Sequence, residues 1–272
     1  MITVRIRLPA LMLLTCLVII VSAISAQEIQ LSEDQMRTFL LNAKVVNGRQ
    51  VGKGIAGIYR LTLSDGKITH DAAFQSIDEY KQVMKFEDGR VEINFRDSYK
   101  YDIGAYELAK LLGLSDMMPV TVPRKWQGQP GALSWWLPVK MDEEERIKRH
   151  IEPPDPEAWN RQMHKMRVFA QLVYDTDRNL GNVLISEDWH LWMIDFSRAF
   201  RLYSTLENVK NLTRCNRQLM EKLRQLDSKE LTENTKGFLT KAEIQAVMGR
   251  REKIVAVFDA LVAQKGEKEV LY

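Results

Sequence analysis

The sequence predicts an α+β protein with two lobes, a β-rich amino-terminal lobe and a helical carboxyl-terminal lobe. Short apolar segments separated by Asp-Gly turns extend to about residue 96, whereas long segments with helical spacing dominate after residue 157. A charged and then proline-rich stretch, residues 140–158, marks the boundary. We therefore divide the chain into a leader (residues 1–26), a β-rich lobe (27–139) and a helical lobe (140–272).

The leader has the composition of a secretory signal peptide. Arg5 and Arg7 give a basic start, an apolar run covers residues 10–24, and small residues follow up to Ala26. The alternative is an uncleaved membrane anchor, for which the apolar run is short. We expect export to the periplasm or the cell exterior, with no stable membrane span after cleavage.

The mature chain is nearly neutral. Removing the leader lowers the number of Lys and Arg residues from 39 to 37, against 36 acidic residues. This balance gives no electrostatic reason to expect nucleic acid as a partner. Cys215 is the one cysteine outside the leader, and the four histidines lack ligand spacing, so neither a disulfide nor a Cys/His metal site is expected.

The β-rich half opens with a short helix. Ser32 and Gln35 have capping-box spacing at the start of residues 32–43, which show helical periodicity. A second helix is expected over residues 101–113, with Gly113 at its carboxyl end. The strand candidates are Ala43–Val46, Ile58–Leu63, Ile68–Gln75, Val91–Phe95, Val120–Pro123 and Ala132–Val139.

The helical half begins with a long helix over residues 157–174. A small hairpin follows, with strands Val183–Ile185 and Leu191–Ile194 around a Glu-Asp turn. Residues 215–266 again have helical patterns. The hairpin therefore lies between the long helix and the helical tail.

Three polar residues flank this hairpin with the spacing that phosphoryl transfer requires. Asp177 lies in the loop after the long helix, Asn182 follows five residues later, and Asp195 ends the hairpin. Phosphoryl transfer needs a carboxylate that orients the acceptor hydroxyl and oxygen ligands that hold Mg²⁺. Asp177 fits the first role, and Asn182 and Asp195 fit the second. The alternative is that Asp177 and Asn182 only cap turns.

The strings DRNLGN and IDFSRAF around these residues resemble the atypical kinases, namely the phosphoinositide lipid kinases, the HipA-like kinases and the secretory-pathway kinases of the four-jointed group. The four-jointed group also matches at residues 101–114, 118–123 and 131–136. The resemblance covers about residues 50–205. It implies a two-lobed protein-kinase-like fold, ATP and a divalent metal (Mg²⁺ or Mn²⁺) as cofactors, and an exported protein or glycan as acceptor.

A glycine pattern adds a candidate phosphate-covering loop. Gly52, Gly54 and Gly57 fit G-x-G-x-x-G, and the residues after them read as a strand. A dinucleotide-binding fold needs a helix there, whereas a kinase glycine loop lies between two strands. An ordinary glycine-rich turn is the alternative.

Two positions depart from the resembled family. Its phosphate-binding Lys, on the third strand, corresponds to the neutral Gln75, and the helical Glu that pairs with this Lys corresponds to Asp102. Ser197 also replaces the Gly of the Asp-Phe-Gly element. The lysines that could substitute for the missing cation are Lys53, Lys67 and Lys100.

Two hypotheses follow. The first is an active exported kinase that transfers phosphate from ATP to a protein or sugar hydroxyl, and Asp177, Asn182 and Asp195 favour it. The second is a catalytically inactive pseudokinase that acts as an exported binding or scaffold protein. Gln75 favours the second hypothesis, as does the scarcity of ATP outside a bacterial cytoplasm.

Overall fold

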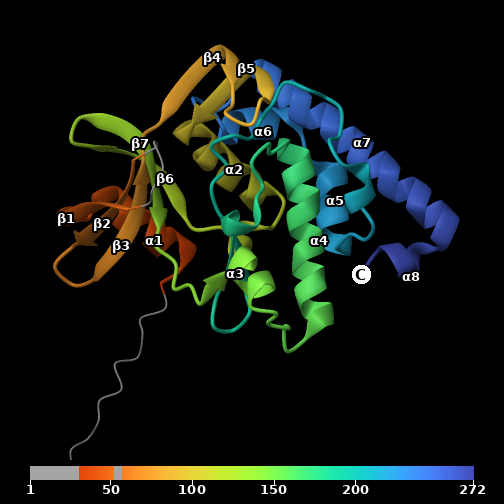
Figure 1. Ribbon diagram of the computed structural model, residues 1–272, viewed down its shortest axis with the longest axis horizontal. Helices are drawn as coiled ribbons and strands as arrows, with labels where there is room; N and C mark the ends of the chain where they lie inside the picture. The colour runs from red at the N-terminus through yellow and green to blue at the C-terminus, as the bar shows by residue number, and fades with distance from the viewer. Residues whose placement is uncertain (1–30, 52–56) are drawn as a thin grey trace, which may run out of the picture. The chain divides into compact units, whose positions relative to one another are not determined.

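The computed structural model describes residues 31–51 and 57–272, and Ser32–Tyr272 forms one compact unit (Figure 1). The expected signal peptide, residues 1–26, lies outside the described residues. Within the described part, none of the helices combines the length and apolar character needed to cross a membrane. The unit has a sheet-rich amino-terminal part and a helical carboxyl-terminal part, as predicted.

The amino-terminal part is built on a five-stranded antiparallel sheet. Helix α1 (Glu33–Asn42) precedes the sheet, and the predicted capping box is present because Ser32 and Gln35 exchange hydrogen bonds. The strands lie in the order β1-β2-β3-β7-β6. Their bounds are β1 (Lys44–Val51), β2 (Ile58–Ser64), β3 (Thr69–Gln75), β6 (Thr121–Trp126) and β7 (Gln129–Trp135).

Strands β3 and β7 approach closely at their ends. A side chain at Gly131 would collide with the carbonyl oxygen of Gln75 and with the Phe74 ring, so glycine is required at this position. The contact fixes the end of β3 against the neighbouring strand. It therefore fixes the place of Gln75, the last residue of β3.

The predicted bounds of four strands were wrong. Strand β5 (Val91–Ser98) ends at Ser98 rather than Phe95, and β6 covers Thr121–Trp126 rather than Val120–Pro123. Strand β1 continues to Val51 because its backbone pairs with β2 along its whole length. Strand β7 ends at Trp135 rather than Val139. The Trp136 amide still donates to the Asp71 carbonyl, but Pro138 has no amide hydrogen with which to continue a ladder.

A second hairpin lies beside the main sheet. It consists of β4 (Asp78–Lys85), which the sequence did not predict, and β5 (Val91–Ser98). Strand β5 leads directly into helix α2 (Tyr99–Leu111), where Ser98 is the amino-terminal cap. Helix α2 is almost entirely buried, and Gly113 follows it with the positive φ of 69° expected of a carboxyl-terminal cap.

The helical part contains the predicted long helix and small hairpin. Helix α4 (Pro156–Val173) precedes β9 (Val183–Ile185) and β10 (Leu191–Met193), and β8 (Met141–Asp142) completes a sheet of order β10-β9-β8. The tail is helical, as predicted. The other helices are α3 (Glu143–Lys148), α5 (Arg217–Gln225), α6 (Ser228–Asn234), α7 (Lys241–Lys265) and α8 (Glu267–Val270), with 3₁₀ turns at Ser115–Met117, Leu180–Asn182 and Val209–Asn211.

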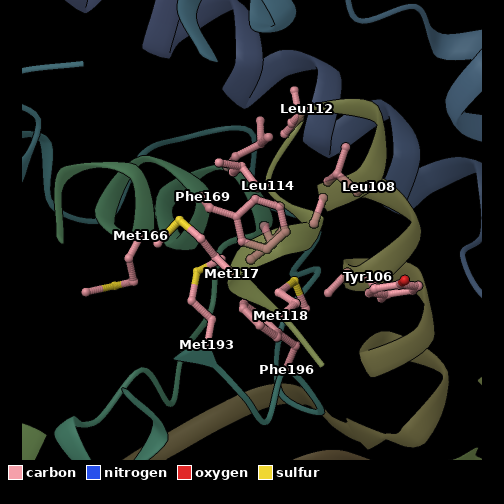
Figure 2. Packing of buried hydrophobic residues seen from close by; sticks show 14 of the residues in the cluster. Tyr106, Leu108, Leu112, Leu114, Met117, Met118, Met166, Phe169, Met193 and Phe196 are labelled. Carbon is pink, nitrogen blue, oxygen red and sulfur yellow. The ribbon is translucent and has the colours of Figure 1, made fainter. Parts of the chain in front are cut away.

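A continuous hydrophobic core joins the two parts. Figure 2 shows Leu108 of α2, Phe169 of α4 and Phe196, which follows β10, among the buried side chains of one cluster. The rings of Phe169 and Phe196 meet edge to face, with centroids 5.4 Å apart. Such burial of aromatic rings contributes strongly to stability. Phe196 is thereby locked in place, and its neighbour Asp195 is held at the edge of the core.

Candidate active site

A pocket of about 470 Å³ lies between the main sheet and the β9–β10 hairpin. Four predicted site residues line it, namely Gln75, Asp102, Asn182 and Asp195. Its remaining lining is mostly apolar and includes Ile58, Ala73, Met118, Ala132, Leu184 and Met193. A largely apolar pocket with a few convergent polar groups is typical of small-molecule sites.

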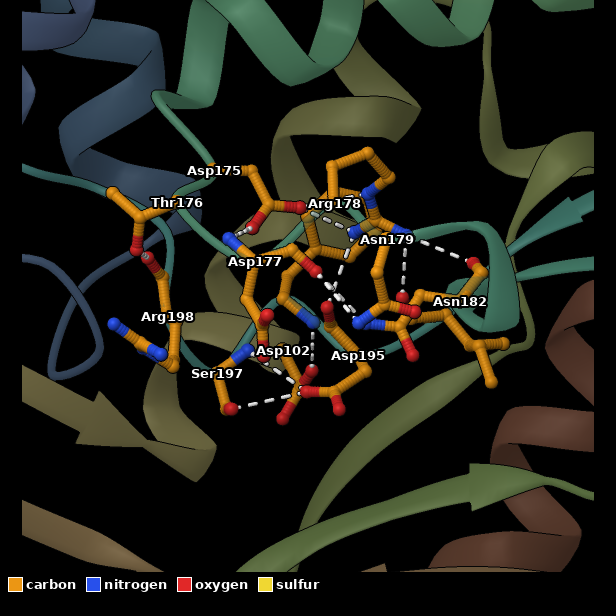
Figure 3. Close-up of polar contacts among 12 residues, drawn as sticks. Asp102, Asp175, Thr176, Asp177, Arg178, Asn179, Asn182, Asp195, Ser197 and Arg198 are labelled. Atoms are coloured by element: carbon orange, nitrogen blue, oxygen red, sulfur yellow. Dashed lines mark hydrogen bonds and ion pairs between the residues drawn. The ribbon is translucent and has the colours of Figure 1, made fainter. Parts of the chain in front are cut away.

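Arg178 organises the loop that precedes β9 (Figure 3). Its guanidinium group donates to the carbonyl oxygens of Asn182 (2.9 Å), Ile194 (2.7 Å) and Asp195 (3.1 Å). It also pairs with the Asp175 carboxylate at 2.5 Å. The buried Arg178 side chain thus connects the loop to the end of β10. This fixes the positions of Asn182 and Asp195 relative to each other.

Asp175 is the anion that balances Arg178. Its side chain is 0% exposed and that of Arg178 is 9% exposed. Burial raises the pKa of Asp175, and the neighbouring Arg178 cation opposes this shift. The sequence prediction did not assign roles to either residue, although Arg178 directly follows the candidate base Asp177.

Asp177 is fixed by its main chain, and its carboxylate remains available. Its carbonyl oxygen accepts hydrogen bonds from the amide of Asn179 (2.7 Å) and from Nδ2 of Asn182 (3.1 Å). Within the described part of the chain its carboxylate accepts no hydrogen bond, and the side chain is half-buried. Asp177 does not line the pocket itself, so it lies beside the pocket rather than inside it.

The amide of Asn182 has a defined orientation. Because Nδ2 donates to the Asp177 carbonyl, the assigned orientation leaves Oδ1 as an acceptor. Asn182 lines the pocket, so Oδ1 is a candidate ligand for a hard cation.

Asp195 adopts a backbone conformation that is uncommon for a residue other than glycine, with φ of 56°. Its Oδ1 accepts hydrogen bonds from the hydroxyl (3.0 Å) and the amide (3.4 Å) of Ser197. The positive φ therefore occurs at Asp195, and Ser197 is not among the residues with positive φ. Replacement of glycine by serine at 197 thus imposes no strain and adds a hydrogen bond to Asp195.

Asp102 projects from α2 into the same pocket. Asp102 is only 8% exposed, and its Oδ1 accepts a hydrogen bond of 2.7 Å from the amide of Phe196. Its Oδ2 is buried without a hydrogen-bond partner. Burial, and then the nearby Asp195 carboxylate, raise the pKa of Asp102 well above the usual range.

Gln75 and Asp102 occupy the positions that correspond to the Lys–Glu pair of the resembled family. Among the described residues, no hydrogen bond joins Gln75 to Asp102, although both line the pocket. No Lys or Arg is found in the described lining. Lys67 is exposed in a turn and Lys100 pairs with Asp78 at 2.7 Å, so neither replaces the missing cation, whereas Lys53 lies outside the described residues.

Of the three glycines in the predicted phosphate-covering loop, the structure describes Gly57 alone. Gly52 and Gly54 lie outside the described residues, and Gly57 directly precedes β2. The segment 52–57 has β1 on one side and β2 on the other, which is the arrangement expected of a kinase glycine loop.

The oxygen atoms that converge on the pocket suit Mg²⁺ or Mn²⁺. Asp102, Asn182 and Asp195 offer carboxylate and amide oxygens, which are the donors that hard divalent cations select. No group of three or more His, Cys, Asp or Glu residues in the described part of the chain has the geometry of a metal site. The candidate set therefore consists of few protein ligands, as is usual when phosphate oxygens complete the coordination of Mg²⁺.

Comparison with solved structures shows that the chain has a protein-kinase-like fold. No protein-family model matches the sequence, and no curated protein matches it.

Three solved structures with a similar fold are a Fam20 protein, a casein kinase and a bacterial kinase. A Fam20 protein of hydra, solved with a sugar, has 15% identity and a TM-score of 0.64, with 88% of this chain and 91% of that chain covered. A Golgi casein kinase has 12% identity and a TM-score of 0.62 over 88% of this chain and 78% of that one. The proinflammatory kinase CtkA of Helicobacter pylori has 10% identity and a TM-score of 0.54 over 83% and 98%.

Proposed function

We propose that the chain is an exported atypical kinase that binds ATP with Mg²⁺ or Mn²⁺ and transfers the γ-phosphoryl group to a protein or sugar hydroxyl. One observation carries the proposal. Arg178 donates hydrogen bonds to the backbone carbonyls of Asn182 and Asp195, and the side chains of these two residues line the pocket. The carboxylate of Asp177, which has no partner among the described residues, lies beside this pocket.

Each residue has a role that follows from its contacts. Asp177 orients the acceptor hydroxyl and accepts its proton. Asn182 and Asp195 are the protein ligands for the divalent metal, which supplies positive charge to the transferring phosphoryl group when it is bound. The glycine pattern of Gly52, Gly54 and Gly57 supports a phosphate-covering role for the segment between β1 and β2, and Gln75 and Asp102 line the nucleotide pocket.

The acceptor and the compartment are inferred from the neighbours and the leader. One similar structure holds a sugar and another is a casein kinase, which supports a glycan or an exported protein as the acceptor. The leader supports export. Mass spectrometry of the native protein should find an amino terminus near Ile24 or Gln27, and an intact Met1 form in the cytosol would contradict export.

The second candidate function is a pseudokinase that binds partners without phosphoryl transfer. The observation that favours it is the missing cation, because Gln75 is neutral and the described pocket lining contains no Lys or Arg. A triphosphate in such a pocket depends on metal ions for charge balance.

A phosphoryl-transfer assay separates the two candidates. Labelled ATP with Mg²⁺ or Mn²⁺ is incubated with the mature protein and with panels of exported proteins and sugars. The kinase proposal expects transfer by wild type and a loss of at least about 10²-fold in Asp177→Asn, which keeps the shape and removes the base. Full activity of Asp177→Asn would exclude Asp177 as the base, and absence of transfer in every condition would favour the pseudokinase.

A further inference from the structure

A second pocket, of about 320 Å³, lies between the β4–β5 hairpin and the helical part. It shares no lining residue with the nucleotide pocket. Two arginines line it, Arg96 of β5 and Arg201, which follows the Asp195 segment. Exposed apolar side chains on its border include Tyr80, Ile93, Leu202 and Tyr203.

Arg201 is fixed at the base of this pocket. It is 6% exposed. It donates to the carbonyl oxygen of Arg96 (2.9 Å) and to the hydroxyl of Thr176 (3.3 Å), and it pairs with Glu92 at 2.5 Å. Its Nε is nevertheless buried without a hydrogen-bond partner. A native structure seldom leaves such a donor unsatisfied.

Arg96 has the same unsatisfied donor. Its Nε is buried without a partner, and its one ion-pair contact, to Asp78, is long at 3.5 Å. Asp78 is held more closely by Lys100 (2.7 Å) and Ser98 (2.8 Å). Arg96 therefore shares the Asp78 carboxylate with Lys100, which lies closer to it.

The other acidic residues near the two arginines are Glu92, Asp97 and Glu243, and burial raises the pKa of Asp97. Glu92 is shared between Arg201 and Arg198, which lies 2.6 Å from it. Burial lowers the pKa of Arg201, Glu92 opposes this shift, and the neighbouring Arg198 cation adds to it. Glu243 also lines the pocket, but its carboxylate accepts hydrogen bonds from the Tyr101 hydroxyl and from Thr240.

We propose that this pocket binds a small tetrahedral oxyanion, phosphate or sulfate, either free or as a monoester, between Arg96 and Arg201. Two guanidinium groups line one pocket. An oxyanion there can accept hydrogen bonds from the terminal N–H groups of Arg96, whose side chain is 37% exposed, and the positive charge of Arg201 attracts it. Hydrogen bonds between guanidinium groups and phosphate oxygens are among the stronger ones in proteins. The assignment rests on this cluster alone and goes beyond the proposed kinase function.

The pocket is connected to the candidate catalytic loop. Arg201 donates to the hydroxyl of Thr176, which directly precedes Asp177, and the same hydroxyl donates to the carbonyl of Arg198 (3.0 Å). An anion bound by Arg201 would therefore contact the same guanidinium group that donates to Thr176 in the loop of Asp177.

The test is a titration of the mature protein with inorganic phosphate, with sodium chloride at equal ionic strength as the reference. Phosphate stabilises many proteins by exclusion from their surfaces, so the decisive comparison is between variants. We expect saturable binding, by thermal shift and calorimetry, that Arg96→Gln weakens by about tenfold or more, the loss expected for one charged hydrogen bond. Arg90→Gln, on the same hairpin and exposed, should bind like wild type.

A further variant and two monoesters keep the result interpretable. Asp78→Asn should tighten binding by removing a competing anion, and it provides a test if Arg96→Gln does not fold. Phosphoserine and phosphotyrosine, titrated in parallel, distinguish a monoester from the free ion by which binds more tightly. Equal phosphate affinity in wild type and Arg96→Gln, or no saturable binding in wild type, would overturn the assignment.

Discussion

The two sides of the nucleotide pocket differ in how completely their polar groups are satisfied. On the helical side, Arg178 and Asp175 form a buried ion pair, and the guanidinium group also binds three backbone carbonyls. The opposite side is formed by the main sheet and α2, and we call it the sheet side. There, Asp102 has one carboxylate oxygen without a partner among the described residues, and Gln75 occupies the position where the resembled family has a lysine.

This difference indicates which part of the site the fold maintains by itself. The helical side is held by protein contacts and is complete without a ligand. The sheet side contains a carboxylate whose charge is unbalanced among the described residues. The positions of Asn182 and Asp195 are therefore set by the fold, whereas the phosphate-facing side depends on what binds there.

The largest expected effect concerns the helical side. Arg178→Met should lower the free energy of unfolding by roughly 3–5 kcal/mol, because it leaves the Asp175 carboxylate buried without its cation. Urea unfolding measures this loss. Arg149→Met is the matched control. Arg149 is 60% exposed and pairs with Glu145 at the surface, so its effect should stay below about 1 kcal/mol. A similar small loss in both variants would contradict the comparison.

Asp102→Asn should act in the opposite direction. Its side chain keeps an acceptor for the Phe196 amide and removes a buried charge, so the variant should be more stable at neutral pH by roughly 1–3 kcal/mol in metal-free buffer.

The pH dependence of this gain has a defined sign. The folded-state pKa of Asp102 is raised, so the penalty for its charge is full above that pKa and disappears as the pH falls below the unfolded value, about 4. The advantage of Asp102→Asn should thus shrink with falling pH. The exposed Asp116→Asn serves as control, and an advantage that is independent of pH would show that charge is not its cause.

The smallest expected effect tests the missing cation. Gln75→Lys should tighten ATP binding in the presence of Mg²⁺ by about tenfold, since a lysine at this position brings charge to the phosphates. Calorimetric titration measures the change, with Gln129→Lys on the exposed end of β7 as control. Unchanged or weaker binding would mean that another lysine already has this role.

Local signals in the sequence predicted most of the fold. The capping box at Ser32, the glycine at 113 and the apolar periodicity of α4 each depend on neighbouring residues, and each is present. Strand β4 was missed because it is mostly polar and exposed, and only its pairing with β5 makes it a strand. The length of β1 likewise depends on its partner strand.

The candidate site could be predicted in part for the same reason. Asp177, Asn182 and Asp195 follow a short spacing pattern, so residue order alone indicated them. The role of Arg178 depends on three carbonyls, of Asn182, Ile194 and Asp195, that meet only in the folded chain. The unpaired oxygen of Asp102 and the position of Gln75 beside it in the pocket also follow from tertiary structure.

The most direct test of the account is a thermal-shift titration of the mature protein with ATP, with and without Mg²⁺ or Mn²⁺. Ligands that bind the folded state raise the midpoint of unfolding. We expect ATP and metal together to raise the midpoint in wild type and in the exposed-site control Asp259→Ala, and to have no effect in Asp195→Ala. An equal rise in Asp195→Ala, or no rise in wild type, would contradict the claim that Asp195 holds a metal-bound nucleotide in this pocket.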